Sequence, residues 1–121
     1  MKTKAEILEG LGNFYGTLAY HKISPKLVLT DGMKYLCESA ECFWLADLVN
    51  SVLYDKKILS YIKRYSPVVV SIKLDGNGGA VVKIGKVYEQ KIDYTDFPLE
   101  SFEFYVADNG DFLVALLFGE N

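Results

Sequence analysis

The chain has 121 residues, of which half are apolar and 14% are aromatic. This length fits one domain over residues 1–121, and the apolar content excludes a disordered chain because it is enough to bury a substantial core. The formal net charge of −3 argues against a strongly basic nucleic-acid binder.

The first segment is predicted to be a short amphipathic helix. Thr3 and Glu6 form a capping-box pattern, in which the hydroxyl and the carboxylate each satisfy a free backbone N–H. Gly10 and Gly12 end this helix. No apolar leader precedes it, and no later run approaches the ~18 apolar residues of a membrane span. We therefore expect a cytoplasmic protein without membrane association.

Residues 14–20 alternate in side-chain character, with Phe, Gly, Leu and Tyr at the even positions. Such alternation predicts a β-strand. Residues 21–26 contain a Ser-Pro pair and are predicted to form a loop. Residues 27–29 could then form a short strand that returns beside the first.

Residues 30–54 hold the longest helical pattern and the only Trp. Apolar residues recur at helical spacing in two runs, Met33, Leu36, Cys37 and Ala40, then Trp44, Leu45, Leu48, Val49, Val52 and Leu53. Thr30 or Asp31 is placed to cap the first turn. We predict two consecutive helices with a bend near Ser39, and Trp44 largely buried against a sheet.

The two cysteines are predicted to act as small buried side chains. Cys37 and Cys42 would lie about 140° apart around a helix, so they would not face each other to form a disulfide. A zinc site would need two further soft ligands, and His21 is the only histidine. We predict neither a metal site nor a cofactor.

Four cations, Lys56, Lys57, Lys63 and Arg64, bracket apolar residues in the 54–65 segment. This segment is predicted to be either a last helical turn or a short extra helix. We interpret the cations as a solvated face that compensates the helix C-terminus. Direct nucleic-acid binding through them is an alternative that the overall charge disfavours.

After Pro67 the apolar period changes to two. Strands are predicted around residues 68–74, 80–84, 88–94, 102–106 and 112–118, in a five-strand meander. Residues 75–79 (Asp-Gly-Asn-Gly-Gly) predict a hairpin turn with a positive φ at Asn77, Gly78 or Gly79. A phosphate loop would instead need a following helix and a Lys-Ser/Thr pair. The last strand is apolar on both faces, so we expect it to be central or covered on both sides.

Helices that come early and strands that come late predict an α+β fold. We expect a single domain in which N-terminal helices, those of residues 32–54, pack on one face of a mostly antiparallel sheet of about five strands.

No catalytic constellation is evident, and we assign no catalytic residue. Asp47 lies on the polar side of the second central helix and reads as a solvated carboxylate. Alternatively, it packs under the 15–21 strand, where His21 or a Tyr hydroxyl could bond to it. His21, Asp31 and Asp47 could together line a pocket of a small enzyme or ligand-binding domain. Nine Tyr residues would favour a recognition surface wherever they are exposed.

Four short stretches together resemble a known family: Gly16-Thr17, Tyr20-His21, residues 30–36 (Thr-Asp-Gly-Met-Lys-Tyr-Leu) and residues 43–47 (Phe-Trp-Leu-Ala-Asp). The chain resembles a group of short bacterial proteins, many from phages and plasmids, that share a domain of unknown function. The resemblance covers residues 14–54 well and 94–99 more loosely. It implies an accessory protein of a mobile element. The chain ends in Phe-Gly-Glu-Asn, where the resemblance implies a Leu-Pro-x-Glu-like ending.

The functional hypothesis combines this context with charge. Residues 1–65 carry nine Lys or Arg against seven Asp or Glu, whereas residues 66–121 carry four against nine. We expect a small non-enzymatic protein that binds a host protein with a basic surface, and that inhibits a bacterial defence system such as a CRISPR effector. The acidic side chains expected to meet that surface are Glu89, Asp93, Glu100, Glu103, Asp108 and Asp111. The sequence leaves the oligomeric state open.

Overall fold

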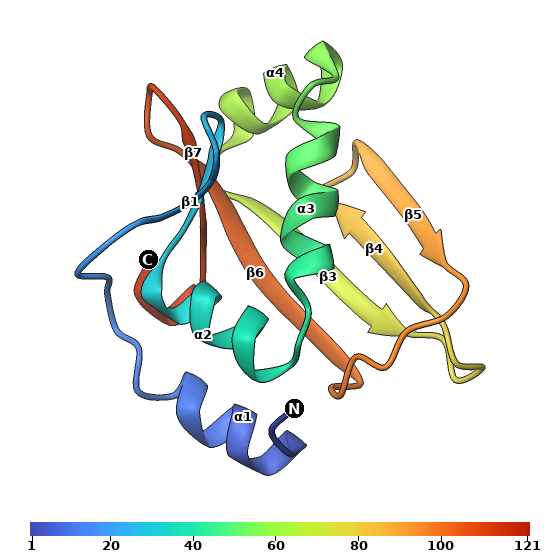
Figure 1. Cartoon of the computed structure of the whole chain (residues 1–121). Coiled ribbons are helices and arrows are strands. Elements are labelled where there is room, and N and C mark those ends of the chain that lie inside the picture. The colour runs from blue at the N-terminus through green and yellow to red at the C-terminus, as the bar shows by residue number, and fades with distance from the viewer.

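The computed structural model describes residues 1–121 and contains four α-helices, seven strands and a short 3-10 helix (Figure 1). The helices are α1 (Lys4–Leu11), α2 (Asp31–Ser39), α3 (Phe43–Val52), α4 (Lys56–Tyr65) and η1 (Phe118–Glu120). The strands are β1 (His21–Ser24), β2 (Leu27–Leu29), β3 (Val68–Leu74), β4 (Ala80–Ile84), β5 (Tyr88–Ile92), β6 (Ser101–Asp108) and β7 (Leu113–Leu116). None of the helices is long and apolar enough to cross a membrane.

All seven strands form one sheet, in the order β1-β2-β7-β6-β3-β4-β5. β2 and β7 run parallel, and every other neighbouring pair runs antiparallel. The fold combines α-helices with a mixed sheet. The sheet has seven strands, which is more than the approximately five, mostly antiparallel strands that were expected. The β1–β2 hairpin supplies the two extra strands, because it pairs with β7. The predicted meander order is also wrong, because β6 pairs with β3 and not with β5.

β7 lies inside the sheet, between β2 and β6. All of its residues are buried. Leu113 and Ala115 join the main core, whereas Val114 and Leu116 join a smaller apolar cluster on the opposite face. The expectation that this doubly apolar strand is central is confirmed, since both of its faces need a cover.

Residues 14–20 form an irregular segment, so the predicted strand is wrong there. The strand begins instead at His21, in the stretch predicted as a loop. The Thr17 hydroxyl explains the difference. It accepts the Asp31 N–H at 2.9 Å and donates to the Ala19 carbonyl at 2.6 Å. Side-chain to backbone bonds of this kind compete with a strand ladder.

α2 and α3 are the two consecutive helices that the sequence predicts. Thr30 caps α2, and its hydroxyl oxygen accepts the Met33 N–H at 3.3 Å. α2 ends at Ser39 and α3 begins at Phe43, so the bend falls where it was expected. At residues 56–65 the structure has a separate helix, α4, which Asp55 caps.

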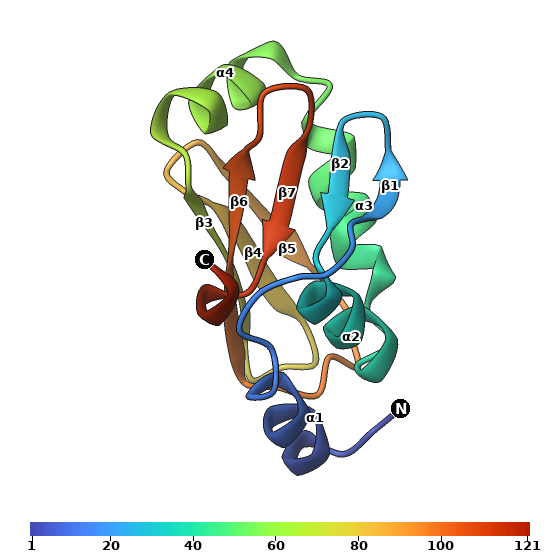
Figure 2. The same ribbon diagram turned by 90° about the vertical axis from the view of Figure 1, so that its left-hand side faces the viewer.

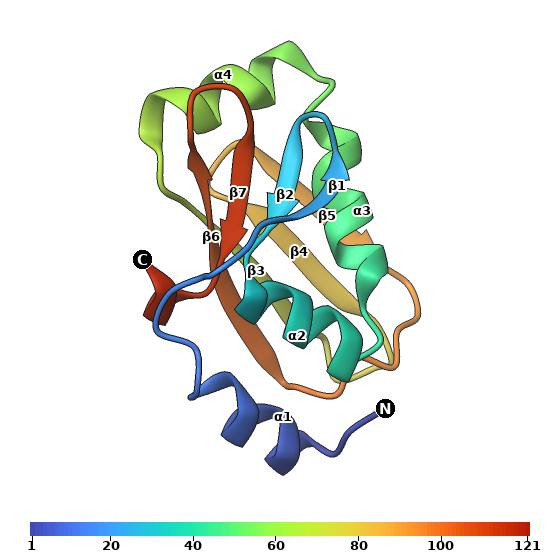
Figure 3. The same cartoon turned by 60° about the vertical axis from the view of Figure 1, so that its left-hand side comes forward.

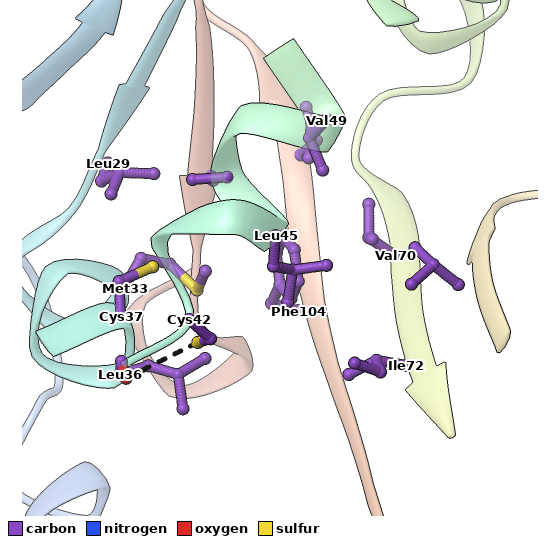
Figure 4. Close-up of a cluster of buried hydrophobic side chains, with 14 of the residues drawn as sticks. Leu29, Met33, Leu36, Cys37, Cys42, Leu45, Val49, Val70, Ile72 and Phe104 are labelled. Carbon is purple, nitrogen blue, oxygen red and sulfur yellow. Dashed lines mark hydrogen bonds between the residues drawn. The ribbon is translucent and has the colours of Figure 1, made fainter. Parts of the chain in front are cut away.

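Trp44 is only partly buried at the edge of the core, contrary to the prediction. Its neighbour Leu45 is fully buried instead, and belongs to the same core cluster as Phe104 of β6 and Val70 and Ile72 of β3 (Figure 4). Successive helical positions are about 100° apart, so only one of the two side chains can point directly at the sheet.

The sheet curves around α3. Figure 1 shows α3 in front of β3 and β4, and α3 also contacts β1, at one edge of the sheet. α2 lies on the same face (Figure 3), so the expectation that the helices of residues 32–54 cover one face is confirmed. We call the opposite face the outer face. Seen from its side, β6, β7 and β2 lie in front of α3, with no long helix over them (Figure 2).

Residues 75–79 form the predicted hairpin turn between β3 and β4. The Asp75 carboxylate accepts the N–H groups of Asn77 and Gly79 at 2.7 and 3.1 Å. The positive φ within the predicted trio falls on Gly78, at 89°, and not on its two neighbours.

Candidate functional site

Asp31, the first residue of α2, fixes the irregular Thr17–Tyr20 loop in place. Its carboxylate oxygen Oδ2 accepts the Leu18 N–H at 2.9 Å, and its own N–H donates to the Thr17 hydroxyl at 2.9 Å. Asp31 therefore holds the loop through two bonds, one from its side chain to the Leu18 backbone and one from its own backbone to the Thr17 side chain. Thr17 and Asp31 both belong to the motif that carries the family resemblance.

His21 completes this arrangement. Its Nε2 lies 2.7 Å from Asp31 Oδ1, and the two side chains are 30% and 27% exposed. The hydrogen bond with His21, followed by that from the Leu18 N–H, lowers the pKa of Asp31 below its usual value. An ionised carboxylate can only accept, so His21 must carry a proton on Nε2. The sequence placed His21 and Asp31 in one pocket, and the structure brings these two together.

Thr30 and Gly32 hold the C-terminal tail. The Glu120 carboxylate accepts the Thr30 hydroxyl at 2.6 Å, the Gly32 N–H at 3.1 Å and the Leu117 N–H at 3.0 Å. A Cβ on Gly32 would lie 2.6 Å from Glu120 Oε1 and 2.5 Å from Leu117 Cδ1. The Thr-Asp-Gly motif thus uses Thr to cap α2 and bind the tail, Asp to hold the loop, and Gly to admit the carboxylate.

Sequence reasoning missed Glu120, although a signal was present. The tail Leu117-Phe118-Gly119-Glu120 keeps the Leu and the Glu of the expected Leu-Pro-x-Glu-like ending and differs in having Phe for Pro. The residue that matters for docking the tail is the Glu, and it is in place.

The fixed loop presents apolar side chains to solvent. Leu18 is completely exposed, although its backbone N–H is held by Asp31. Tyr20 is 49% exposed, and its ring meets Phe112 edge-on with the centroids 5.8 Å apart. A hollow of about 260 Å³ is lined by the loop itself, Thr17 to Tyr20. The loop is therefore a well-positioned, solvent-facing apolar surface.

The outer face carries a second apolar cluster beside this loop, in which three members are buried and three are partly buried. Outward-pointing residues of β2, β6 and β7, together with Phe112, form an apolar cluster that we call the outer patch: Val28, Tyr105, Ala107, Phe112, Val114 and Leu116. Tyr20 borders it through Phe112, and Phe118, 44% exposed, borders it through Tyr105, with ring centroids 4.4 Å apart. The alternation of strand side chains separates this cluster from the main core on the other face.

Five of the six acidic residues that the sequence singled out lie in two groups, and the sixth, Glu100, directly precedes β6. Glu103 is on β6, and Asp108 and Asp111 flank the β6–β7 turn, all close to the outer patch. Glu89 lies on β5 and pairs with Lys83 of β4 at 3.4 Å, while Asp93 directly follows β5. The sheet order places β5 three strands away from β6. The structure therefore does not bring these carboxylates together on one surface.

Asp47 is exposed on α3 and forms no hydrogen bond or ion pair. The partner proposed for it, His21, is instead bonded to Asp31. The four cations Lys56, Lys57, Lys63 and Arg64 are all exposed on α4. None of these five side chains bonds to the loop, although Lys63 lines a hollow with Asp111 and Phe112 beside the outer patch.

Cys37 and Cys42 are buried free thiols near the α2–α3 junction (Figure 4). A hydrogen bond with Cys37, and then burial, raises the pKa of Cys42, so this thiol stays protonated. No group of three or more His, Cys, Asp or Glu side chains is arranged to hold a metal ion.

Comparison with known proteins gives one match. No curated protein and no solved structure matches the chain significantly. One family model matches residues 5–121, which is nearly the whole chain. The chain therefore belongs to the family described as Family of unknown function (DUF6876).

Proposed function

We propose that this protein is a small non-enzymatic accessory protein that binds a host protein through Leu18, Tyr20 and the partly exposed margin of the outer patch. The observation that carries the proposal is the Leu18 loop. Its side chain is completely exposed, while its backbone is held by the Asp31 carboxylate.

An exposed apolar side chain on a fixed backbone costs little entropy to bury in a complex. Contiguous apolar surface that includes aromatic side chains is typical of interaction sites, whereas scattered exposed apolar residues are ordinary. Here Tyr20 and Phe118 are exposed and border the outer patch through their ring contacts with Phe112 and Tyr105.

Charge indicates the chemistry of the partner. Glu103, Asp108 and Asp111 lie near the outer patch, so they would favour a partner whose apolar contact surface is rimmed by Lys and Arg. Exposed charges of this kind act mainly on the association rate, over a screening length of about 8–10 Å. The narrower hypotheses, a mobile-element origin and inhibition of a defence system such as a CRISPR effector, stay predictions that the partner's identity would test.

The experiment is a matched comparison of surface variants. The protein is used to capture partners from bacterial extracts, which are identified by mass spectrometry, purified and titrated. Leu18→Ser should fold normally, because a fully exposed side chain contributes little to stability, and should weaken binding at least about tenfold. Tyr94→Ser is the control, since Tyr94 is 81% exposed and follows β5, remote from the patch.

Charge variants test the second half of the proposal. Changing Glu103, Asp108 and Asp111 to Gln or Asn should lower the association rate, and the effect should shrink as salt rises. The same changes at Glu89 and Asp93 should have little effect. A partner that binds Leu18→Ser as tightly as wild type, and is lost when Lys56 and Lys57 become Glu, would place the binding surface on α4 instead.

The His21–Asp31 pair supports a second candidate function, a small enzyme or ligand-binding domain. A carboxylate that orients a histidine is a recurring element of acid–base sites. His21→Gln separates the candidates, because Gln can still donate to Asp31 and keep the loop in place. If the pair serves only to position the loop, this variant binds the partner like wild type. Loss of partner binding in a folded His21→Gln protein, with the loop unchanged, would instead assign the imidazole a direct role.

A further inference from the structure

β5 is the last strand of the sheet and leaves one edge without a partner (Figure 1). Its sequence is Tyr-Glu-Gln-Lys-Ile, and the three middle residues are exposed. A strand at the edge of a sheet presents backbone N–H and C=O groups that can pair with another strand. This edge lies at the opposite end of the sheet from β1, β2 and β7, so an association through β5 is independent of the proposed function.

The alternation of backbone hydrogen bonds along the strands shows which N–H and C=O groups of β5 face the free edge. The Gly85 N–H donates to the Val69 carbonyl of β3 at 2.8 Å, so the odd-numbered residues of β4 bond towards β3. In an antiparallel ladder the bonding direction alternates along the strand. The even-numbered residues of β4 therefore bond towards β5, where their register partners are Tyr88, Gln90 and Ile92. The backbone groups of Glu89 and Lys91 are left facing the free edge.

Those two residues carry opposite charges, one on each side of Gln90. If a second β5 paired antiparallel about a two-fold axis at Gln90, Glu89 of each copy would lie opposite Lys91 of the other. An axis at Glu89 or at Lys91 would place like charges opposite each other, which is destabilising. The charge pattern thus selects one register among those that the outward-facing groups allow.

The other face of the strand fits the same register. Tyr88 and Ile92 are partly buried against the core and would lie opposite each other across the axis. They would occupy non-hydrogen-bonded positions, where side chains approach most closely. Aromatic and β-branched side chains form favourable cross-strand pairs. We propose that two copies of this chain associate through their β5 edges, antiparallel about Gln90, into one continuous sheet.

Sedimentation velocity on the full chain and on charge variants tests the proposal. Wild type should form a dimer with a dissociation constant below about 1 mM. Glu89→Lys places two lysines opposite each other twice in the dimer, and Lys91→Glu does the same with glutamates. Each single variant should dimerise at least about tenfold more weakly. An equal mixture of the two should recover association as a heterodimer, because every cross-strand pair is then of opposite charge.

The controls make the same charge changes away from the edge. Glu100→Lys and Lys57→Glu alter exposed residues outside β5 and its flanking turns, and should leave the dimer unchanged. Lys91→Pro removes an outward N–H that takes no part in the β4–β5 ladder, so it should give a folded monomer. A wild type that stays monomeric at about 1 mM would overturn the proposal. So would two single charge variants that dimerise as tightly as wild type.

Discussion

At one end of the sheet, contacts between residues far apart in the sequence join the β1–β2 hairpin to β7. At the other end, a hairpin turn joins each successive pair of β3, β4 and β5. We call these the motif end and the hairpin end. At the motif end, Thr30 bonds to Glu120, and β2 pairs with β7 from the opposite end of the chain. At the hairpin end, Asp75 bonds only to its own turn. The comparison shows that the motif residues form long-range contacts that fix an exposed loop.

The largest effect should come from the core that both ends share. Leu45 is fully buried between α3 and the sheet, so Leu45→Ala should lower the free energy of unfolding by about 2–5 kcal/mol. Trp44→Ala should cost clearly less, because Trp44 lies at the edge of the core. Urea unfolding of both variants checks this order, and the reverse order would return Trp44 to the central place that the sequence predicted.

One glycine at each end tests how closely the chain packs there. Gly32→Ala crowds the Glu120 carboxylate and Leu117, whereas Gly79→Ala crowds the backbone carbonyl of Ile92. Each should cost about 1–3 kcal/mol. A Glu120→Ala background should reduce the additional cost of Gly32→Ala, because one clashing side chain is gone, and should leave that of Gly79→Ala unchanged. A double-mutant cycle in urea measures the coupling. Equal coupling of both glycines to Glu120 would remove the distinction between the two ends.

At each end of the sheet, one carboxylate should make the folded state less stable at low pH, but the local effects of removing the two carboxylates should differ. Bonds from His21 and the Leu18 N–H lower the pKa of Asp31, and bonds from the Asn77 and Gly79 N–H groups lower the pKa of Asp75. Each lowered pKa gives stability that is complete above the unfolded value of about 3.9 and is lost as pH falls through the folded value.

Replacing either residue by Asn should therefore flatten the loss of stability below about pH 4. Removing the acceptor altogether, by Asp31→Ala, should also speed hydrogen exchange at the Leu18 amide, which NMR can follow at neutral pH, whereas Asp75→Ala should not. Unchanged exchange at Leu18 would show that the loop is held by contacts other than the Asp31 carboxylate.

The smallest effect should come from the surface ion pair at the hairpin end. Lys83 lies 3.4 Å from Glu89, and both side chains are more than half exposed. Lys83→Gln should change the free energy of unfolding by less than about 1 kcal/mol in dilute solution. A larger loss, measured by urea unfolding, would mean that the hairpin end also depends on its side chains beyond the turns.

Local features of the fold could be predicted from the sequence. The Thr3 capping box, the Thr30 cap, the bend after Ser39 and the 75–79 turn each depend on residues within a few positions of one another. The central position of β7 followed from its apolar character on both faces. These predictions succeeded because the physical cause lies inside the segment.

The candidate site was only partly predictable. The sequence predicted a pocket near His21, Asp31 and Asp47, and only the first two of these side chains bond to each other. The bond between Thr30 and Glu120 was not foreseen, because it joins residues 90 positions apart. Residues 14–20 have the alternation of a strand, and only the Thr17 contact with Asp31 shows that they are a loop. The pairing of β6 with β3 likewise depends on strand order, which side-chain periodicity does not encode.

The parallel pairing of β2 with β7 also sets the order of events when the chain folds. Leu27 aligns with Leu113, so β2 leaves the ribosome long before its neighbour exists. Until β7 arrives, the β1–β2 hairpin is an isolated two-stranded unit, which is marginally stable at best in water. Contacts between such distant segments slow the search for the native state. We therefore expect the Leu18 loop, which is fixed by Asp31 just after β2, to reach its final position late, although it is among the first parts to be synthesised.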